Sequence, residues 1–326
     1  MRIAIIGAGF IGQKRAAAKD PKDSILGFFD VSIEASESAV SVFGGAAFTS
    51  LDQVLDAVEI GDAVVIATSH DSLASTAQLF VEAGCNVLLE KPGARSHEEL
   101  ESVRRVKREE QVVAVGYNHR FHPGLLRLKE LADSERYGQL LSIRARYGHG
   151  GRPGYETEWR ADKTLSGGGE LLDQGSHLID LTRYVGGRFD LITSHVDTLK
   201  WDMKVEDNAW LIGSTGSSGV ASLHASWTEW KNIFSFEVFF EVAKVEVNGL
   251  GGSYGPETII ESHMEKGHGP PLVTSTQFPP GDQSWSLEWQ DFKHSVETGE
   301  RDQGARIADA LAVLEVVGEV YDNANI

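Results

Sequence analysis

The chain has 326 residues, which fits one large or two ordinary domains, and 41% of them are hydrophobic and 24% charged. Lysine and arginine together number 30 against 48 aspartates and glutamates, for a formal net charge of −18. Binding to nucleic acid or to an anionic membrane needs a basic surface, so this charge argues against both classes of protein. The single cysteine, Cys85, excludes an intramolecular disulfide framework and a zinc site built from cysteines.

The chain carries no recognisable targeting segment. The apolar run at residues 3–6 is too short for the hydrophobic region of a signal peptide, and Gly7 follows it directly. No window of the sequence approaches the roughly 18 apolar residues that a membrane span needs. We therefore expect a soluble cytoplasmic protein that binds neither nucleic acid nor a membrane.

Short apolar runs alternate with helical patterns over the first third of the chain. The apolar runs predict buried strands, and the segments between them have the period and length of helices. Strands separated by helices form βαβ units, so we predict a doubly wound parallel sheet in a first domain over residues 1–122. The predicted strands are 3–6, 25–29, 63–67, 86–89 and 112–115, and the predicted helices are 11–19, 51–57, 72–83 and 96–110.

The remainder of the chain, residues 123–326, has the pattern of a different fold. Sequential strand patterns joined by short turns predict a mainly antiparallel sheet in an α+β domain, whose terminal helices pack back on the first domain. The clearest alternation puts five apolar side chains on one face, namely Phe234, Phe236, Val238, Phe240 and Val242. The predicted strands are 140–147, 191–199, 208–213, 219–228, 235–240 and 244–247, and the predicted helices are 124–133, 287–296 and 307–321.

A glycine motif follows the first predicted strand and opens the first predicted helix. Gly7, Gly9 and Gly12 fit the pattern G-x-G-x-x-G, with Phe10 and Ile11 in the two positions before the last glycine. The first glycine permits a tight turn, the second lets the backbone approach a pyrophosphate, and the third allows close packing of helix on strand. The helix N-terminus supplies unpaired N–H groups to the anion. We therefore predict that this segment binds a dinucleotide; the alternative is an ordinary surface turn.

The second predicted strand leads into Asp30, which lies 18 residues after Gly12. A carboxylate at this place accepts hydrogen bonds from both hydroxyls of the adenosine ribose and repels a 2′-phosphate. The next two residues, Val31 and Ser32, provide no arginine that could bind such a phosphate. The sequence therefore predicts NAD as the cofactor in preference to NADP, with a plain surface aspartate as the alternative.

Polar residues follow two further predicted strands. The third predicted strand, 63–67, ends with Ala67 and is followed by Thr68 and His70. The fourth predicted strand, 86–89, is followed by Glu90 and Lys91. Because ligands bind at the carboxyl ends of strands in such sheets, we predict that these residues contact the cofactor. His70 is a candidate for the ribose or nicotinamide, or else a polar loop residue. Glu90 and Lys91 could alternatively form an exposed ion pair at a turn.

Asp173 and His177 are four residues apart in an otherwise apolar helical pattern, so they share one helix face. This pair suits general acid–base chemistry, in which the histidine exchanges a hydroxyl proton and the aspartate orients it. A run of glycines at 167–169 lets a ligand or another backbone approach the helix start. The alternatives are a metal site, for which no further ligand cluster is present, and a helix cap with a hydrogen-bonded core histidine.

Taken in order, these motifs resemble the glucose–fructose oxidoreductase / inositol dehydrogenase (Gfo/Idh/MocA) family. The resemblance rests on G-x-G-x-x-G at 7–12, Glu-Lys-Pro at 90–92, the segment 116–123, Trp-Arg at 159–160, the glycine run and D-x-G-x-H at 173–177. It implies a Rossmann domain followed by a domain with an open-faced sheet that often forms dimers or tetramers. It also implies a catalytic triad of Lys91, Asp173 and His177, with no metal.

The resemblance assigns further residues to the cofactor and the substrate. Asn118 and Arg120 would lie beside the nicotinamide, and Trp159 and Arg160 near cofactor and substrate. The segment 147–155 is similar to family members that act on sugars in glycan or nucleotide-sugar pathways. The candidate substrate contacts, besides the triad, are Tyr117, His149, Arg152 and Tyr155.

The predicted function is an NAD-dependent oxidoreductase that moves a hydride between a secondary hydroxyl or ketone of a sugar, nucleotide-sugar or cyclitol and the nicotinamide. We assign His177 as the acid–base group, Lys91 to polarise and position the oxygen, and Asp173 to orient the pair. Two alternatives remain open at this point. One is a glycosidase that uses tightly bound NAD for transient oxidation and elimination, and the other is a non-enzymatic NAD-responsive regulator.

Overall fold

The computed structural model describes residues 1–216, 219–264, 269–300 and 302–324. The chain forms two compact units that each contain two stretches of sequence. The first unit contains Met1–Asn118 and Ser284–Ala312, and the second contains His119–Gln283 and the chain from Val313 onward. Within the described ranges, no helix is long and apolar enough to cross a membrane.

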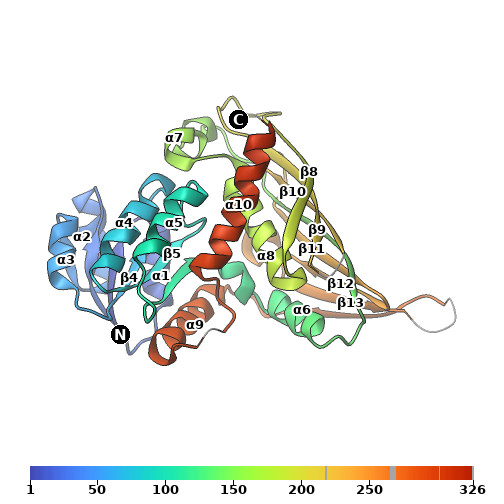
Figure 1. Cartoon of the computed structure of the whole chain (residues 1–326), viewed down its shortest axis with the longest axis horizontal. Coiled ribbons are helices and arrows are strands. Elements are labelled where there is room, and N and C mark those ends of the chain that lie inside the picture. Colours follow the sequence, from blue (N-terminus) through green and yellow to red (C-terminus); the bar gives the residue numbers. More distant parts are fainter. Residues whose placement is uncertain (217–218, 265–268, 301, 325–326) are drawn as a thin grey trace. The chain divides into compact units, whose positions relative to one another are not determined.

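The first unit is built on a six-stranded parallel sheet in the order β3-β2-β1-β4-β5-β6. Figure 1 labels strands β4 and β5 of this sheet and the helices of this unit. The central strands of the sheet are apolar and buried along their length, as expected for a sheet covered by helices on both faces. The parallel sheet predicted for the first domain is therefore confirmed. The strands are β1 (Arg2–Ile6), β2 (Ser24–Phe29), β3 (Ala46–Phe48), β4 (Ala63–Ile66), β5 (Asn86–Glu90) and β6 (Val113–Gly116).

Helices connect successive strands of this sheet, and most of them lie within a few residues of their predicted bounds. No element is predicted over 33–48, yet this segment forms a helix and the edge strand β3. Only Ser36 and Ala39 of this helix are fully buried, and its larger apolar side chains Val40 and Phe43 are partly buried against the core, so its sequence shows a less obvious apolar pattern. The helices are α1 (Phe10–Ala18), α2 (Ile33–Phe43), α3 (Leu51–Ala57), α4 (His70–Glu82) and α5 (His97–Val106).

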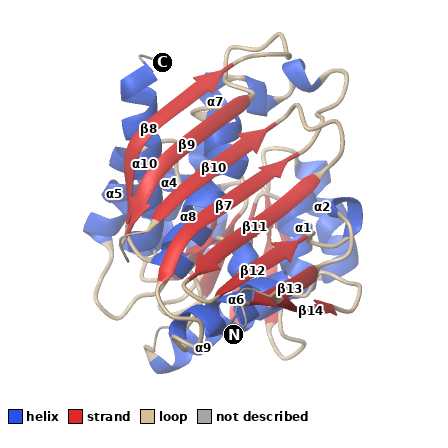
Figure 2. Cartoon of the chain, turned by 90° about the vertical axis from the view of Figure 1, so that its right-hand side faces the viewer, coloured by secondary structure: helices blue, strands red, loops and turns tan. Residues whose placement is uncertain are grey.

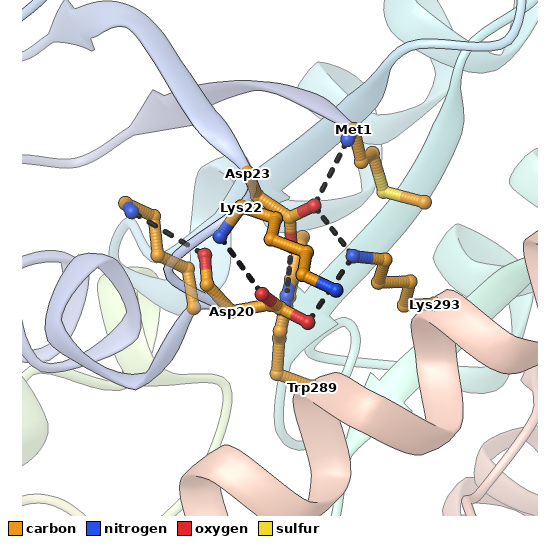
Figure 3. Close-up of polar contacts among 7 residues, drawn as sticks. Met1, Asp20, Lys22, Asp23, Trp289 and Lys293 are labelled. Atoms are coloured by element: carbon orange, nitrogen blue, oxygen red, sulfur yellow. Dashed lines mark hydrogen bonds and ion pairs between the residues drawn. The ribbon is translucent and has the colours of Figure 1, made fainter.

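Helix α9 (Ser284–Thr298) comes from the late part of the sequence but belongs to the first unit. Figure 3 shows the polar contacts that hold it there: Asp23 accepts hydrogen bonds from Trp289 Nε1 and Lys293 Nζ, both at 2.8 Å, and from the amino group of Met1 at 2.9 Å. Trp289 also packs into the apolar core of this unit, together with Phe292. The last helix, α10 (Ile307–Ala324), is divided between the two units.

The second unit is built on an eight-stranded sheet in the order β14-β13-β12-β11-β7-β10-β9-β8, which Figure 2 shows face on. All neighbouring pairs are antiparallel except β7 and β10, which are parallel. The predicted mainly antiparallel sheet is therefore confirmed. The strands are β7 (Leu140–Gly148), β8 (Phe189–Asp197), β9 (Asn208–Thr215), β10 (Val220–Ser226), β11 (Ile233–Phe240), β12 (Ala243–Asn248), β13 (Thr258–His263) and β14 (Leu272–Gln277).

One face of this sheet packs on helices α6 (Pro123–Asp133) and α8 (Ser176–Gly186). The alternation predicted in β11 points four apolar side chains into the core, but the strand ends at Phe240, and Val242 beyond it is 40% exposed. The opposite face carries partly exposed apolar side chains, among them Ile212 and Val220. Helices α6 and α8, the second of which carries His177, therefore lie on the same side of this sheet.

Candidate functional site

The three motif glycines occupy structurally different places at the end of β1. Gly7 has a φ of 93°, and a Cβ atom there would lie 2.4 Å from the carbonyl oxygen of Ala67. A Cβ atom on Gly12 would lie 1.8 Å from the carbonyl oxygen of Gly7, so this glycine allows α1 to pack against the strand. A Cβ atom on Gly9 would meet no atom within 4 Å. The middle glycine therefore faces open space at the start of α1, where a pyrophosphate could approach the backbone.

Asp30 lies directly after β2 and is hydrogen-bonded to this loop. Its Oδ2 accepts from Ala8 N at 2.8 Å and its Oδ1 from Ser32 N at 3.0 Å. Phe10, at the start of α1, and Val31, which follows Asp30, are 79% and 98% exposed. The structure thus holds a carboxylate beside the open glycine loop, and its acceptor oxygens fit the hydroxyls of the adenosine ribose of NAD.

The end of β4 forms the neighbouring part of the same sheet edge. Ala67 N donates to the carbonyl oxygen of Ile6 at 2.7 Å, which continues the β1–β4 pairing one residue past the end of β4. His70 is the first residue of α4 and is 5% exposed. Its place is therefore a buried helix start at the carboxyl edge of the sheet.

Glu90 ends β5 and is buried, and Lys91 follows it with a cis peptide bond to Pro92. Glu90 Oε1 accepts from Arg15 Nε at 2.6 Å, and the same guanidinium also pairs through Nη1 with Glu288 on α9. Burial raises the pKa of Glu288 to about 7, and the negative charges of Glu90 and Asp291 also raise it, although the Arg15 guanidinium lowers it. The residue before Lys91 therefore belongs to a buried charged cluster, which contains Arg15, Glu90 and Glu288.

The segment after β6 passes from the first unit to the second. Tyr117 is fully buried, and Asn118 Nδ2 donates to the Ser284 hydroxyl at 2.8 Å. Arg120 lies in the second unit and forms a two-point ion pair with Asp180 of α8, with distances of 2.8 and 2.5 Å. Both side chains of this pair are buried, so Arg120 fixes the segment to the helix that carries His177.

His177 lies in the first turn of α8 and is 4% exposed. Its imidazole ring stacks on that of His119 with centroids 3.8 Å apart, and the Tyr147 ring stands against it at 6.0 Å and 70°. His119 lies in the segment 116–123 that carried the family resemblance, where a cofactor-loop or structural role was expected. Its neighbour His122 is hydrogen-bonded through Nδ1 to Glu257 at 2.9 Å. The predicted acid–base group therefore sits in a buried shell of rings.

Asp173 lies in a π-helical turn, Leu171–Gly175, which precedes α8. The spacing of four to His177 therefore crosses from π to α geometry, where a single α-helix was expected. Asp173 Oδ2 is 3.3 Å from Arg160 Nε, and the guanidinium of Arg160 lies over the ring of Trp159 at 4.6 Å. The structure thus brings together two separate motifs, the Trp-Arg pair at 159–160 and the D-x-G-x-H motif that contains Asp173.

The segment that follows β7 packs on aromatic side chains. His149 Nδ1 accepts from Gly151 N at 2.9 Å, and burial lowers the pKa of His149, so its ring is neutral at pH 7. Tyr155 is 5% exposed and meets the Trp227 ring edge to face at 4.9 Å. Arg152 is exposed and pairs with Glu158. His149 and Tyr155 thus lie in one ring cluster, and Arg152 points to solvent.

Two further polar residues contribute to this region: Gln174, at a variable position of the D-x-G-x-H motif, and Tyr254, which lies outside the motifs. Gln174 Nε2 donates to the Tyr254 hydroxyl at 3.2 Å, and the Tyr254 ring lies 5.4 Å from that of Tyr147. Burial raises the pKa of Tyr254 to about 12. Tyr254 follows β12 in a glycine-rich segment that is far from Gln174 in sequence. Across the described residues, no group of three or more histidine, cysteine, aspartate or glutamate side chains could hold a metal ion.

Two family models match the chain. Residues 1–119 match the NAD-binding Rossmann fold of the GFO/IDH/MocA oxidoreductase family, and residues 125–246 match the C-terminal domain of the same family. These models cover the glycine loop, Asp30 and Lys91 in the first unit, and Asp173 and His177 in the second.

Curated relatives include sugar dehydrogenases. Levoglucosan dehydrogenase of Pseudarthrobacter phenanthrenivorans is 27% identical over 61% of this chain and 54% of its own length. Glucose-6-phosphate 3-dehydrogenase of Bacillus subtilis is 30% identical over 60% of this chain and 56% of its own length. The matched part thus spans about half the length of these relatives. A solved levoglucosan dehydrogenase in complex with NADH has the same fold, with a TM-score of 0.89 and 20% identity over 100% of this chain and 97% of its own.

Proposed function

Because the chain belongs to the Gfo/Idh/MocA oxidoreductase family, we propose that it is an NAD-dependent dehydrogenase of a secondary hydroxyl on a sugar, nucleotide-sugar or cyclitol. Curated relatives named for levoglucosan, glucose 6-phosphate and inositol support this substrate class. The proposal divides the chain into a cofactor domain over 1–122 and a substrate and oligomerisation domain over 123–326. It includes a dimer or tetramer formed through the second sheet and a cytoplasmic location.

One observation in the second unit carries this proposal. His177 is a buried imidazole on the first turn of α8, and Asp173 stands four residues before it with its carboxylate paired to Arg160. An imidazole that is shielded from solvent and preceded by a fixed carboxylate is suited to exchange a proton with a substrate hydroxyl.

The first unit supports the cofactor half of the proposal. The open backbone at Gly9 and the helix start at Phe10 would hold the pyrophosphate, and Asp30 would accept from the ribose hydroxyls. Ala67, Thr68 and His70 would line the sheet edge next to it. Bound NAD supplies a hydride acceptor, which no side chain can provide.

The chain's own groups would handle the substrate oxygen and its proton. We assign His177 to take the hydroxyl proton while the carbinol carbon gives up its hydride. The Lys91 ammonium would donate a hydrogen bond to the oxygen and stabilise its developing negative charge. Asp173 would orient the histidine. The other candidate contacts are Asn118 and Arg120 for the cofactor, Trp159 and Arg160 for cofactor and substrate, and Tyr117, His149, Arg152 and Tyr155 for the substrate.

The test is nicotinamide absorbance after the protein is mixed with NAD or NADP and a panel of free sugars, phosphorylated sugars, nucleotide-sugars and inositols. We expect NADH to form with one substrate class and not with the Lys91→Ala variant. Absence of NADH formation with every member of the panel, from protein shown to bind NAD, would contradict the proposal.

A further inference from the structure

The start of the turn that carries Asp173 is hydrogen-bonded to a buried carboxylate from another part of the chain. Glu206, which lies just before β9, is 3% exposed. Its Oε1 accepts three hydrogen bonds: from Gly169 N at 3.0 Å, from Leu171 N at 3.1 Å and from the Tyr321 hydroxyl of α10 at 2.8 Å. One oxygen atom therefore connects the start of this turn to two elements that are distant in sequence.

The glycine run at 167–169 provides the room for this contact. A Cβ atom on Gly168 would lie 2.0 Å from the hydroxyl oxygen of Tyr321, and one on Gly169 would lie 2.0 Å from the carbonyl oxygen of Glu206. The same carbonyl oxygen accepts from Glu170 N at 2.9 Å. Gly168 therefore leaves room for the Tyr321 side chain, and Gly169 leaves room for the backbone of Glu206.

A π-helical turn needs such external support. Its hydrogen bonds are less favourable than those of an α-helix. Single π turns inside helices are rare overall, but those that occur are often found at functional sites. Asp173 is the middle residue of this turn, and its N–H bonds back to the carbonyl oxygen of Gly169 at 3.0 Å. A shift of Gly169 would therefore be passed directly to Asp173.

We propose that Glu206 and Tyr321 are positioning residues, which hold the π turn and thereby fix the orientation of Asp173 and His177. The importance of this orientation for catalysis rests on the function proposed above. The hydroxyl can fill this role at any physiological pH, because burial raises the pKa of Tyr321 well above its ordinary value and keeps it a neutral donor.

The central experiment compares two tyrosine variants of the second unit. Tyr321→Phe removes the hydroxyl that donates to Glu206, and Tyr137→Phe removes a buried hydroxyl that donates to Glu261 at 2.5 Å. Amide hydrogen exchange is then measured by mass spectrometry on peptides that cover 166–177. We expect exchange there to accelerate about five- to tenfold in Tyr321→Phe and to stay unchanged in Tyr137→Phe. This readout needs no substrate.

Turnover gives the second readout. Tyr321→Phe should lower kcat about tenfold while KM for NAD stays unchanged, and Tyr137→Phe should change neither. Glu206→Gln keeps an oxygen acceptor and should retain most of the turnover that Glu206→Ala loses. Unchanged exchange at 166–177 in Tyr321→Phe, or an equal loss of kcat in both tyrosine variants, would overturn the positioning role. If exchange accelerates as expected but the wild type oxidises no sugar or cyclitol, the proposed function fails and the structural role of the pair stands.

Discussion

The two units hold their candidate catalytic groups by different kinds of contact. In the first unit, the turn with Lys91 follows Glu90, whose carboxylate shares a buried guanidinium with Glu288. In the second unit, the His177 ring stacks on that of His119, and the Tyr147 ring contacts both of them. A buried ion pair constrains a carboxylate strongly but responds to pH, whereas ring stacking constrains an imidazole without supplying a countercharge. The difference predicts that variants in the two units will fail in different ways.

The largest effect is expected at the ring shell of the second unit. His177→Ala should lower turnover by about 10²–10⁴-fold, because it removes the group assigned to take the hydroxyl proton, with little change in NAD affinity. Steady-state kinetics and a fluorescence titration with NADH would measure the two quantities. His195→Ala is the matched control, since this exposed histidine lies on β8 of the same sheet. Equal losses in both variants would remove His177 from the mechanism.

In the first unit, two alanine substitutions should separate folding from cofactor binding. Gly9→Ala adds a methyl group into open space, so the melting temperature should stay unchanged while NAD affinity falls about tenfold or more. Gly12→Ala drives a methyl group into the Gly7 carbonyl and should also lower the free energy of unfolding by about 1–3 kcal/mol. Calorimetric binding and thermal unfolding measure both. Normal NAD affinity in Gly9→Ala would place the pyrophosphate elsewhere.

A smaller effect is expected at the ribose carboxylate. Asp30→Asn keeps a side-chain oxygen for Ala8 N but loses the negative charge, so the preference for NAD over NADP should fall about five- to tenfold. Affinities for both cofactors would be compared with those of Asp52→Asn, which changes an exposed carboxylate in the first turn of α3. An unchanged preference in Asp30→Asn would show that other groups exclude the 2′-phosphate.

The smallest expected effect is a pH dependence of stability from the charged cluster of the first unit. The ordinary pKa of Glu288 is 4.5 and burial raises it to about 7, so between these values the folded chain holds a proton that the unfolded chain has lost. The free energy of unfolding should therefore fall as pH rises through this window. The melting temperature of the wild type should decline by about 2–4 °C relative to Glu288→Gln between pH 5 and 8. Parallel curves for the two proteins would argue against this titration.

The sequence predicted those parts of the site that depend on local pattern. The glycine loop and Asp30 lie within one βαβ unit, and their spacing alone indicated the place of the turn and the carboxylate. The contacts of Arg15 with Glu90 and Glu288 join residues 75 and 273 positions apart, and no local periodicity reports such pairs. The same holds for Tyr321, whose hydroxyl reaches a carboxylate 115 positions away.

Local backbone geometry in the second unit was predicted less well. A spacing of four is compatible with an ordinary α-helix, so the pattern around Asp173 could not indicate a π turn. That turn depends on support from outside the helix, at Glu206. The helix α2 was missed for a different reason: only Ser36 and Ala39 on it are fully buried, and its larger apolar side chains Val40 and Phe43 pack against the core while remaining partly exposed.

The single parallel pair of the second sheet has a consequence for how the enzyme is assembled. Strands β7 and β10 are neighbours, yet the chain between them contains α8 and both Asp173 and His177. Parallel neighbours cannot be joined by a tight hairpin, so pairing β7 with β10 closes a loop that contains the whole intervening crossover, and such long-range closure is slow. Native-like helix content should therefore return early during refolding, and catalytic competence should return with the slow, long-range closure of the sheet.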